Sequence, residues 1–183
     1  MPALWSQDKF IRAYNFAAQA HDGQCLPDSD TPYLYHVSLV CMEVMALLSV
    51  EPQYNPDLAL QFAALHDVVE DTSITIKEIQ EKFGSEVAGG VDALTKHKAD
   101  PDAMENSLAR IMQQPAEIWI VKLADRITNL QPPPSGWGHE KIKGYLAESE
   151  VIYQELQGAS PYLAARLAAK IDHYRAAHVE KSP

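Results

Sequence analysis

Apolar residues recur at helical spacing along almost the whole of this sequence, and groups of proline, glycine and aspartate interrupt the pattern. In the first such segment, Phe10, Ile11, Tyr14 and Ala17 fall on one face of a helix. No segment shows the sustained two-residue alternation that a half-buried strand would require. The pattern therefore predicts an all-α chain that folds into a bundle of about eight to ten helices.

The interruptions predict where the helices begin and end. Asp57 is expected to open a helix that runs through the sequence AALHDVVEDTS at residues 63–73. Thr75 is expected to cap the next helix, with Glu78 as its partner in a capping box. The other helices are predicted over residues 6–20, 33–48, 85–96, 102–113, 115–130, 138–157 and 161–178.

The length and charge of the chain narrow the classes of protein to consider. Its 183 residues suffice for one domain with a substantial core. A net charge of −10 argues against a nucleic-acid partner, because phosphate backbones bind clustered Lys and Arg. The first residues lack a signal-peptide pattern, and the most apolar segment is interrupted by Glu43 and is too short to span a bilayer. We therefore expect a cytoplasmic protein with no membrane partner, in which Cys25 and Cys41 are reduced.

The segment AALHDVVEDTS places four ionisable side chains in an apolar setting. His66 and Glu70 are spaced i, i+4, as are Asp67 and Asp71, so each pair shares a helical face. Adjacent side chains on a continuous helix diverge by about 100°. His66 and Asp67 can therefore bind one ion only from the edge of the helix or after a local distortion of it. Imidazole combined with carboxylate favours Mn, Fe, Co or Zn over harder ions.

Two further apolar segments each contain an isolated polar group. His36 lies at the start of an aliphatic helix, and Asp125 lies in VKLADRITNL with Asn129 one helical turn later. Buried groups of this kind cost free energy unless they are hydrogen-bonded or bind a metal. Taken singly, His36 fits a hydrogen-bonded core histidine, and Asp125 with Arg126 fits a structural ion pair. Their joint occurrence with the His66 segment favours one shared site.

The ordered set of motifs resembles the HD superfamily of metal-dependent phosphohydrolases, which is named for its His…His-Asp…Asp signature. HDVVED at 66–71 and VKLADRITNL at 121–130 further resemble the hydrolase domain of the RelA/SpoT family, and the small alarmone hydrolases similar to the metazoan SpoT homologue look closest. Four other elements support this resemblance, which spans roughly residues 5–160: AAQAHDGQ at 17–24, PYLYHVSLV at 32–40, LTK at 94–96 and GWGHEKIKGYLAES at 136–149.

The resemblance implies a single HD-type domain over residues 1–183, acting as a stand-alone pyrophosphohydrolase that removes the 3′-pyrophosphate from alarmone nucleotides. It implies one Mn²⁺ or other divalent transition metal per chain, with the ligands His36, His66, Asp67 and Asp125. Glu70 and Asp71 would position and deprotonate the attacking water. The implied substrate contacts are Lys96, Lys141 and Tyr145 near the phosphates and Asn129 at the sugar.

The loop after His21 departs from the family pattern. Members of the family commonly follow HxGQ with a basic pair that lies over guanine, whereas this chain has Cys25 and Leu26, followed by Asp28 and Asp30. Cys and Leu cannot stack on a purine and donate hydrogen bonds as Arg does. Three explanations remain open: an adenine base, as in (p)ppApp; a looser pocket for several 3′-phosphorylated nucleotides; or guanine, as in (p)ppGpp, held by backbone groups.

Other functions remain alternatives at this point. A different HD phosphohydrolase would act on nucleotide monophosphates or on the 2′-phosphate of NADPH, although a bare HD site needs no Glu70–Asp71 pair. A non-catalytic binding module would have lost a ligand or an acid, and all six positions are present. The apolar last helix fits both a monomer and a homodimer.

Overall fold

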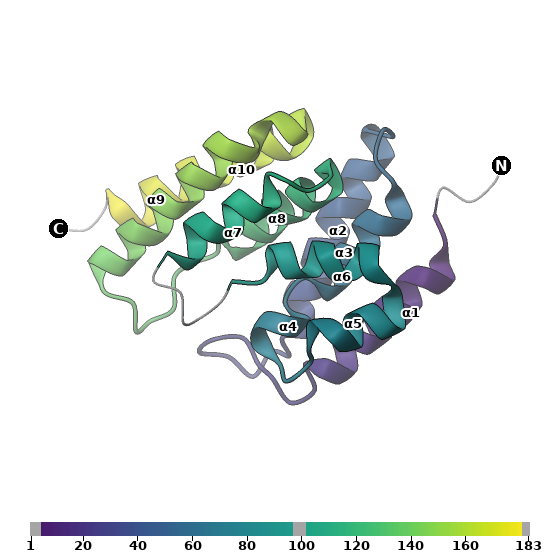
Figure 1. Cartoon of the computed structure of the whole chain (residues 1–183). Coiled ribbons are helices and arrows are strands. Elements are labelled where there is room, and N and C mark those ends of the chain that lie inside the picture. Colours follow the sequence, from purple (N-terminus) through teal and green to yellow (C-terminus); the bar gives the residue numbers. More distant parts are fainter. Residues whose placement is uncertain (1–4, 97–101, 181–183) are drawn as a thin grey trace.

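The computed structural model describes residues 5–96 and 102–180, and within these ranges it contains ten α-helices and no strand (Figure 1). This confirms the predicted all-α fold. A single isolated bridge joins Cys25 to Pro32. The helices are α1 (Gln7–Ala20), α2 (Leu34–Val50), α3 (Pro56–Leu65), α4 (Val68–Asp71), α5 (Ile76–Phe83), α6 (Ser85–Leu94), α7 (Ala103–Ile111), α8 (Ala116–Asn129), α9 (His139–Leu156) and α10 (Pro161–Tyr174), with a 3₁₀ turn η1 (Gln157–Ala159) and a π-helical turn η2 (Arg175–Val179).

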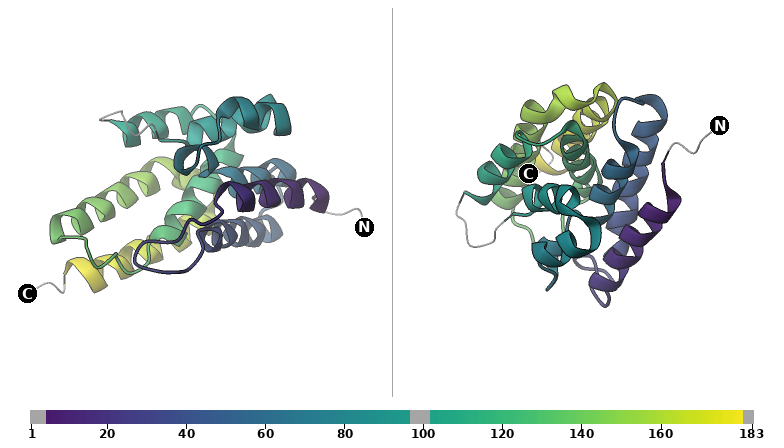
Figure 2. Two further views of the ribbon diagram at one scale, coloured as in Figure 1. Left: turned by 90° about the horizontal axis from the view of Figure 1, so that it is seen from below. Right: turned by 45° about the vertical axis from the view of Figure 1, so that its right-hand side comes forward.

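Helix α8 is the element around which the others pack. It contacts α2 and α3 on one side and α9 and α10 on the other, while α1 lies against α3. Figure 2 shows α9 and α10 running alongside each other, away from the layer formed by α5 and α6. Ten of the 14 residues of α8 are buried, including the aliphatic residues Ile118, Ile120, Val121 and Leu123. The predicted site residue Asp125 is therefore placed at the centre of the bundle.

Helix α2 is apolar over nearly its whole length, and its one charged residue is accounted for by the packing. Glu43 is buried and accepts a hydrogen bond of 2.6 Å from Nε of Arg166 on α10. The ion pair allows the carboxylate to lie between two helices without an unpaired charge. No helix of the described residues is both long enough and apolar enough to cross a bilayer.

The structure corrects the predicted boundaries of the third helix. This helix begins at Pro56, after an Asn55 cap whose side chain accepts from the Leu58 N–H, and not at Asp57. It ends at Leu65 and does not continue through the HDVVED segment. Asn is a preferred N-cap and Pro a preferred first residue, so these two outcompete Asp57 as the start. The capping box between Thr75 and Glu78 is confirmed.

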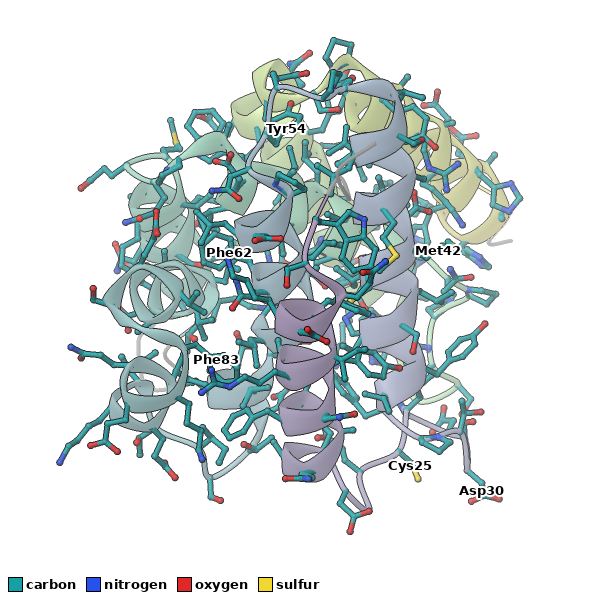
Figure 3. All side chains as sticks on the ribbon, turned by 90° about the vertical axis from the view of Figure 1, so that its right-hand side faces the viewer. Cys25, Asp30, Met42, Tyr54, Phe62 and Phe83 are labelled. Carbon is teal, nitrogen blue, oxygen red and sulfur yellow. The ribbon has the colours of Figure 1, made fainter. Side chains whose placement is uncertain are left out.

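Helix α6 approaches its neighbours so closely that a side chain at one glycine would force them to shift. A Cβ added at Gly90 would overlap the ring of Phe62 and Cδ1 of Ile118. Phe62, which Figure 3 labels, is a buried residue of α3. The adjacent Gly89 lies on the exposed face of the same helix, with nothing within 4 Å of such a Cβ.

We expect Gly90→Ala to lower the free energy of unfolding by about 1–3 kcal/mol through overpacking. The matched variant Gly89→Ala should leave stability unchanged or raise it by up to about 1 kcal/mol, because alanine has the higher helix propensity. Urea denaturation of both variants measures the difference. Equal effects of the two substitutions would contradict the close packing of α6.

Candidate metal centre and adjoining cavity

The α-helix is interrupted at the HD pair, between α3 and α4. His66 and Asp67 form a turn, with φ of −55° at His66 and −102° at Asp67, and α4 starts at Val68. This break removes the divergence that a continuous helix would impose on adjacent side chains. Nε2 of His66 and Oδ2 of Asp67 lie 2.9 Å apart as a result. The sequence allowed His66 and Asp67 to bind one ion either from the edge of a helix or after a local distortion of it. The structure has the local distortion.

Four side chains from separate elements converge at this turn. One nitrogen or oxygen atom from each of His36, His66, Asp67 and Asp125 lies within 4.8 Å of all the others. His36 comes from α2 and Asp125 from α8, and all except the half-buried Asp67 are buried. Measured from Nε2 of His36, the distances are 3.2 Å to Nε2 of His66, 3.4 Å to Oδ2 of Asp67 and 3.4 Å to Oδ1 of Asp125.

These distances fit a single divalent metal ion. Bonds of about 2.0–2.2 Å from zinc-like ions to nitrogen or oxygen place neighbouring donors about 3 Å apart. The set of two imidazoles and two carboxylates is also one that transition metals prefer. The four residues that the sequence predicted as ligands therefore lie where one ion can contact all of them.

The other ring nitrogen of each histidine is already engaged. Nδ1 of His66 lies 2.9 Å from the Ala63 carbonyl oxygen, which can only accept, so Nδ1 carries a proton and Nε2 is the nitrogen that can bind a metal ion. Nδ1 of His36 lies 3.3 Å from Oγ1 of Thr128, whose own proton is donated to the Asp125 carbonyl. Both rings thus present Nε2 toward the cluster, which is the orientation that metal-binding histidines require.

The electrostatics of the cluster favour a bound cation. Burial disfavours protonation of His36, but hydrogen bonds to Asp125 and Asp67 outweigh this effect and raise its pKa to about 10. Burial likewise opposes ionisation of Asp67 and Asp125. The positive charge of His66 nevertheless holds the pKa of Asp67 well below its usual range, and the charge of Lys122 does the same for Asp125. The two carboxylates therefore remain ionised in a buried site.

Lys122 was not predicted from the sequence as part of the site. It is buried on α8, and its Nζ lies 2.9 Å from Oδ2 of Asp125, so Oδ1 of the same carboxylate remains directed at the histidines. Asn129 also donates to Oδ1 of Asp125. A lysine three residues before an aspartate, within an apolar helix, was the signal that could have revealed this pair.

Tyr33 was also missed, although it lies in the quoted PYLYHVSLV segment. Its hydroxyl donates to Oδ2 of Asp67 at 2.5 Å and lies 3.2 Å from Oδ2 of Asp71. Burial and the charge of Asp67 raise the pKa of Tyr33, so the hydroxyl stays protonated and acts as a donor. The stacked ring of His21, whose Nδ1 pairs with Gln24, supports the tyrosine from the other side.

The two acids that follow the HD pair have different surroundings. Asp71 is linked through the Tyr33 hydroxyl to the cluster. Glu70 accepts the backbone N–H of Lys96 at 2.8 Å and lies 3.6 Å from its Nζ. The carboxylate of Glu70 thus anchors the residue that the sequence predicted as a phosphate contact.

A cavity of about 430 Å³ opens beside His36. Asn129 and Tyr145, both predicted substrate contacts, line it, together with the loop residues Leu26 and Asp28. The remaining lining residues named for the described part of the chain are Pro27, Tyr35, Leu39, Thr128, Gln131, Pro132, Pro133, Pro134, Ser135, Trp137 and Tyr174.

The two predicted phosphate-binding lysines lie outside this lining. Nζ of Lys141 is 4.4 Å from the ring centre of Trp137, a residue that lines the cavity, while Lys96 remains with Glu70. Arg126 contacts α9. It packs over the ring of Tyr145 at 4.4 Å and lies 3.4 Å from Glu148.

Residues 13–161 match the HD domain family, and they include all four convergent side chains. The chain belongs to the HD-domain family. Its predicted resemblance to HD hydrolases of the RelA/SpoT type is confirmed by the relatives it matches.

Among these relatives are animal proteins named guanosine-3′,5′-bis(diphosphate) 3′-pyrophosphohydrolase MESH1. The HD-domain chain is 33% identical to the protein of Xenopus tropicalis over 86% of its own length and 89% of the relative's. It is 31% identical to the human protein, over 87% and 90% of the two lengths. A solved metazoan orthologue of SpoT, described as hydrolysing ppGpp, has a TM-score of 0.75 at 28% identity and covers 93% of this chain and 96% of its own.

We expect metal binding to release protons and to strengthen as the pH rises. Below a pKa of about 10, His36 is protonated in the metal-free site, and a metal ion must displace that proton. The charge of Asp67 raises the pKa of His66 as well, although burial opposes this, so the logarithm of the apparent association constant should rise by about one to two per pH unit between pH 6 and 8. Calorimetry in buffers of different ionisation enthalpy measures the released protons. Affinity independent of pH in this range would contradict a ligand role for His36.

We expect Lys122→Met to destabilise the metal-free protein by about 3 kcal/mol, because Asp125 would keep a buried charge with one partner fewer. The loss should be smaller with saturating Mn²⁺, since a bound cation compensates the carboxylate. Thermal unfolding with and without metal measures both values. Lys143→Met, which removes an exposed lysine paired with Glu140, should change stability by less than about 0.5 kcal/mol. An equal loss in both metal states would contradict the proposed coupling.

Proposed function

We propose that this protein is a metal-dependent pyrophosphohydrolase that removes the 3′-pyrophosphate from an alarmone nucleotide. The observation that carries this proposal is the convergence of four metal-type donors, of which His36 also lines the cavity of about 430 Å³, with Asp71 linked to them through Tyr33. Relatives that match most of the chain are named as enzymes of this activity. Residues 1–183 would act as one catalytic unit.

His36, His66, Asp67 and Asp125 would hold the ion, which we propose to be Mn²⁺. A divalent ion in this position supplies charge stabilisation for the attacked phosphate and lowers the pKa of a water molecule. The side chains of the chain itself fix the ligands: Tyr33 donates to Asp67, and Lys122 donates to Asp125. Lys122 leaves Oδ1 of Asp125 for the ion, whereas Tyr33 donates to Oδ2 of Asp67, the same oxygen that faces the two histidines.

Asp71 and Glu70 would act on the attacking water, and their contacts suggest a division of roles. Oδ2 of Asp71 lies 3.2 Å from the Tyr33 hydroxyl, which donates to Asp67 of the cluster, and this link supports a role near the ion. Asp71 would accept the proton of the water as general base. Glu70 would orient both the water and Lys96, because its carboxylate holds the backbone and approaches the ammonium of that lysine.

The substrate would lie across the cavity, with its phosphates toward the cluster. Lys96 and Lys141 would contact phosphate, Asn129 the sugar, and Tyr145 the nucleotide next to its phosphates. Asn129 lines the cavity and donates to Asp125, so it links the ligand to the cluster. The substrate class is a 3′-pyrophosphorylated purine nucleotide, (p)ppGpp or, given Cys25 and Leu26 in the loop, (p)ppApp.

The decisive assay measures pyrophosphate release with Mn²⁺. Guanosine and adenosine 3′-pyrophosphates are compared with GTP, ATP, 5′-monophosphates and NADPH, and the products are separated by chromatography. We expect release from the 3′-pyrophosphorylated nucleotides alone. Turnover only of a monophosphate or of NADPH would overturn the proposal in favour of another HD phosphohydrolase.

Variants separate the proposed roles. Asp67→Ala should abolish both turnover and stoichiometric metal, whereas Asp71→Asn and Glu70→Gln should lower kcat by about 100-fold or more with the metal retained. The control Glu81→Gln alters an exposed carboxylate on α5 that pairs with Lys77 and should leave kcat unchanged. Near-normal turnover in both acid variants would contradict the acid–base assignment.

A further inference from the structure

The cavity beside the cluster has an unexpected charge distribution for a nucleotide-binding site. Among the described residues that line it, none is Lys or Arg, and Asp28 is the one acidic side chain. Prolines, Leu26 and Trp137 supply much of the remaining wall. A carboxylate in such a place repels phosphate and attracts a ligand group that donates a hydrogen bond.

Asp28 is held in position by its own loop and by the segment that follows the three prolines. Its φ of +55° lies in the left-handed region, which Asp and Asn tolerate better than other side chains. Its Oδ2 accepts hydrogen bonds from both the backbone N–H and the hydroxyl of Ser135, each at 2.8 Å. The contact joins two loops 107 positions apart in the sequence.

One oxygen of this fixed carboxylate remains available. Both hydrogen bonds from Ser135 go to Oδ2, and within residues 5–96 and 102–180 no donor is recorded on Oδ1. The side chain is exposed at the rim of the cavity and lines it. The protein thus presents an oriented hydrogen-bond acceptor to whatever lies against this wall.

The position of the cluster determines which part of a nucleotide meets this acceptor. His36 belongs both to the cluster and to the cavity lining, so the reacting phosphate lies at that side. The loop wall with Asp28 is left for the base, whose flat faces can pack against proline and aromatic side chains. Guanine and adenine each have an exocyclic amino group that donates hydrogen bonds, whereas hypoxanthine has none.

We propose that Asp28 is a specificity-determining residue that recognises the exocyclic amino group of the purine base through Oδ1. The inference rests on the proposed function, in that it takes the ligand to be a purine nucleotide. It makes the loop wall selective for amino-purines over oxo-purines that lack the amino group. Ser135 is a positioning residue in this arrangement, since it holds the other carboxylate oxygen.

The test compares Asp28→Asn with the wild-type protein on guanosine, adenosine and inosine 3′-pyrophosphates. Asn keeps the size of the side chain and tolerates the left-handed backbone, but it removes the charge of the acceptor. For the wild type we expect kcat/KM for the better amino-purine to exceed that for inosine by about tenfold, as befits a hydrogen bond to a charged group. Asp28→Asn should reduce this ratio to about twofold or less.

A charge-matched control distinguishes recognition from simple repulsion. Asp30→Asn removes the same charge from the same loop, and Asp30 is not among the residues that line the cavity. Figure 3 shows Asp30 at the tip of the loop, below α1 and α2. Asp30→Asn should leave the ratio of kcat/KM for the amino-purine substrate to kcat/KM for the inosine substrate unchanged. If Asp28→Asn and Asp30→Asn shift all three substrates equally, Asp28 acts by repulsion alone and the inference is overturned.

Calorimetric binding of GDP, ADP and IDP to the metal-loaded protein separates this inference from the reaction itself. In the wild type the better of GDP and ADP should have a lower dissociation constant than IDP. This difference should disappear in Asp28→Asn. Turnover of the 3′-pyrophosphates without that preference would overturn the inference alone. A preference in binding without any turnover would overturn the proposed reaction alone.

Discussion

The burial of two carboxylates and two imidazoles at the centre of an apolar bundle is the constraint on which the rest of the structure depends. Ionised groups removed from water are costly unless opposite charges and hydrogen bonds surround them. Here Asp125 has Lys122 on one oxygen and the histidines on the other, and Tyr33 satisfies Asp67. The aliphatic packing of α8 against α2, α3, α9 and α10 holds these partners in place. The same contacts therefore stabilise the bundle and determine the geometry of the site.

The break between α3 and α4 shows how local backbone chemistry serves that constraint. A continuous helix would have directed His66 and Asp67 about 100° apart. The turn at these two residues instead brings both side chains to the same point, and the short α4 then directs Glu70 toward Lys96 and Asp71 toward Tyr33. Four ionisable side chains within six consecutive positions thus have different sets of contacts.

The sequence predicted the helices and the convergent residues because both depend on local patterns. Apolar periodicity defines α8 whatever its neighbours are, and isolated polar residues within apolar helices revealed His36 and Asp125. Contacts between distant segments were not predictable in the same way. Thr128 orients His36 from 92 positions away, and Ser135 holds Asp28 from 107 positions away, and neither spacing leaves a pattern in one sequence. The start of α3 was mispredicted because two competing capping signals, Asn55 and Asp57, lie two residues apart.

The charges near the site also explain why a metal ion would be indispensable for an anionic substrate. The chain carries a net charge of −10, and the cations nearest the cluster already have acidic partners: Lys122 pairs with Asp125, Lys96 with Glu70, and Arg126 with Glu148. Their charge is largely compensated before a nucleotide arrives. The cavity lining within the described residues adds an acid and no Lys or Arg. Attraction for phosphate would therefore come from a divalent ion at the four convergent donors together with Lys141, whose Nζ lies 4.4 Å from the ring centre of Trp137 in the cavity wall. The ion would couple substrate binding to metal binding at the place where the reaction occurs.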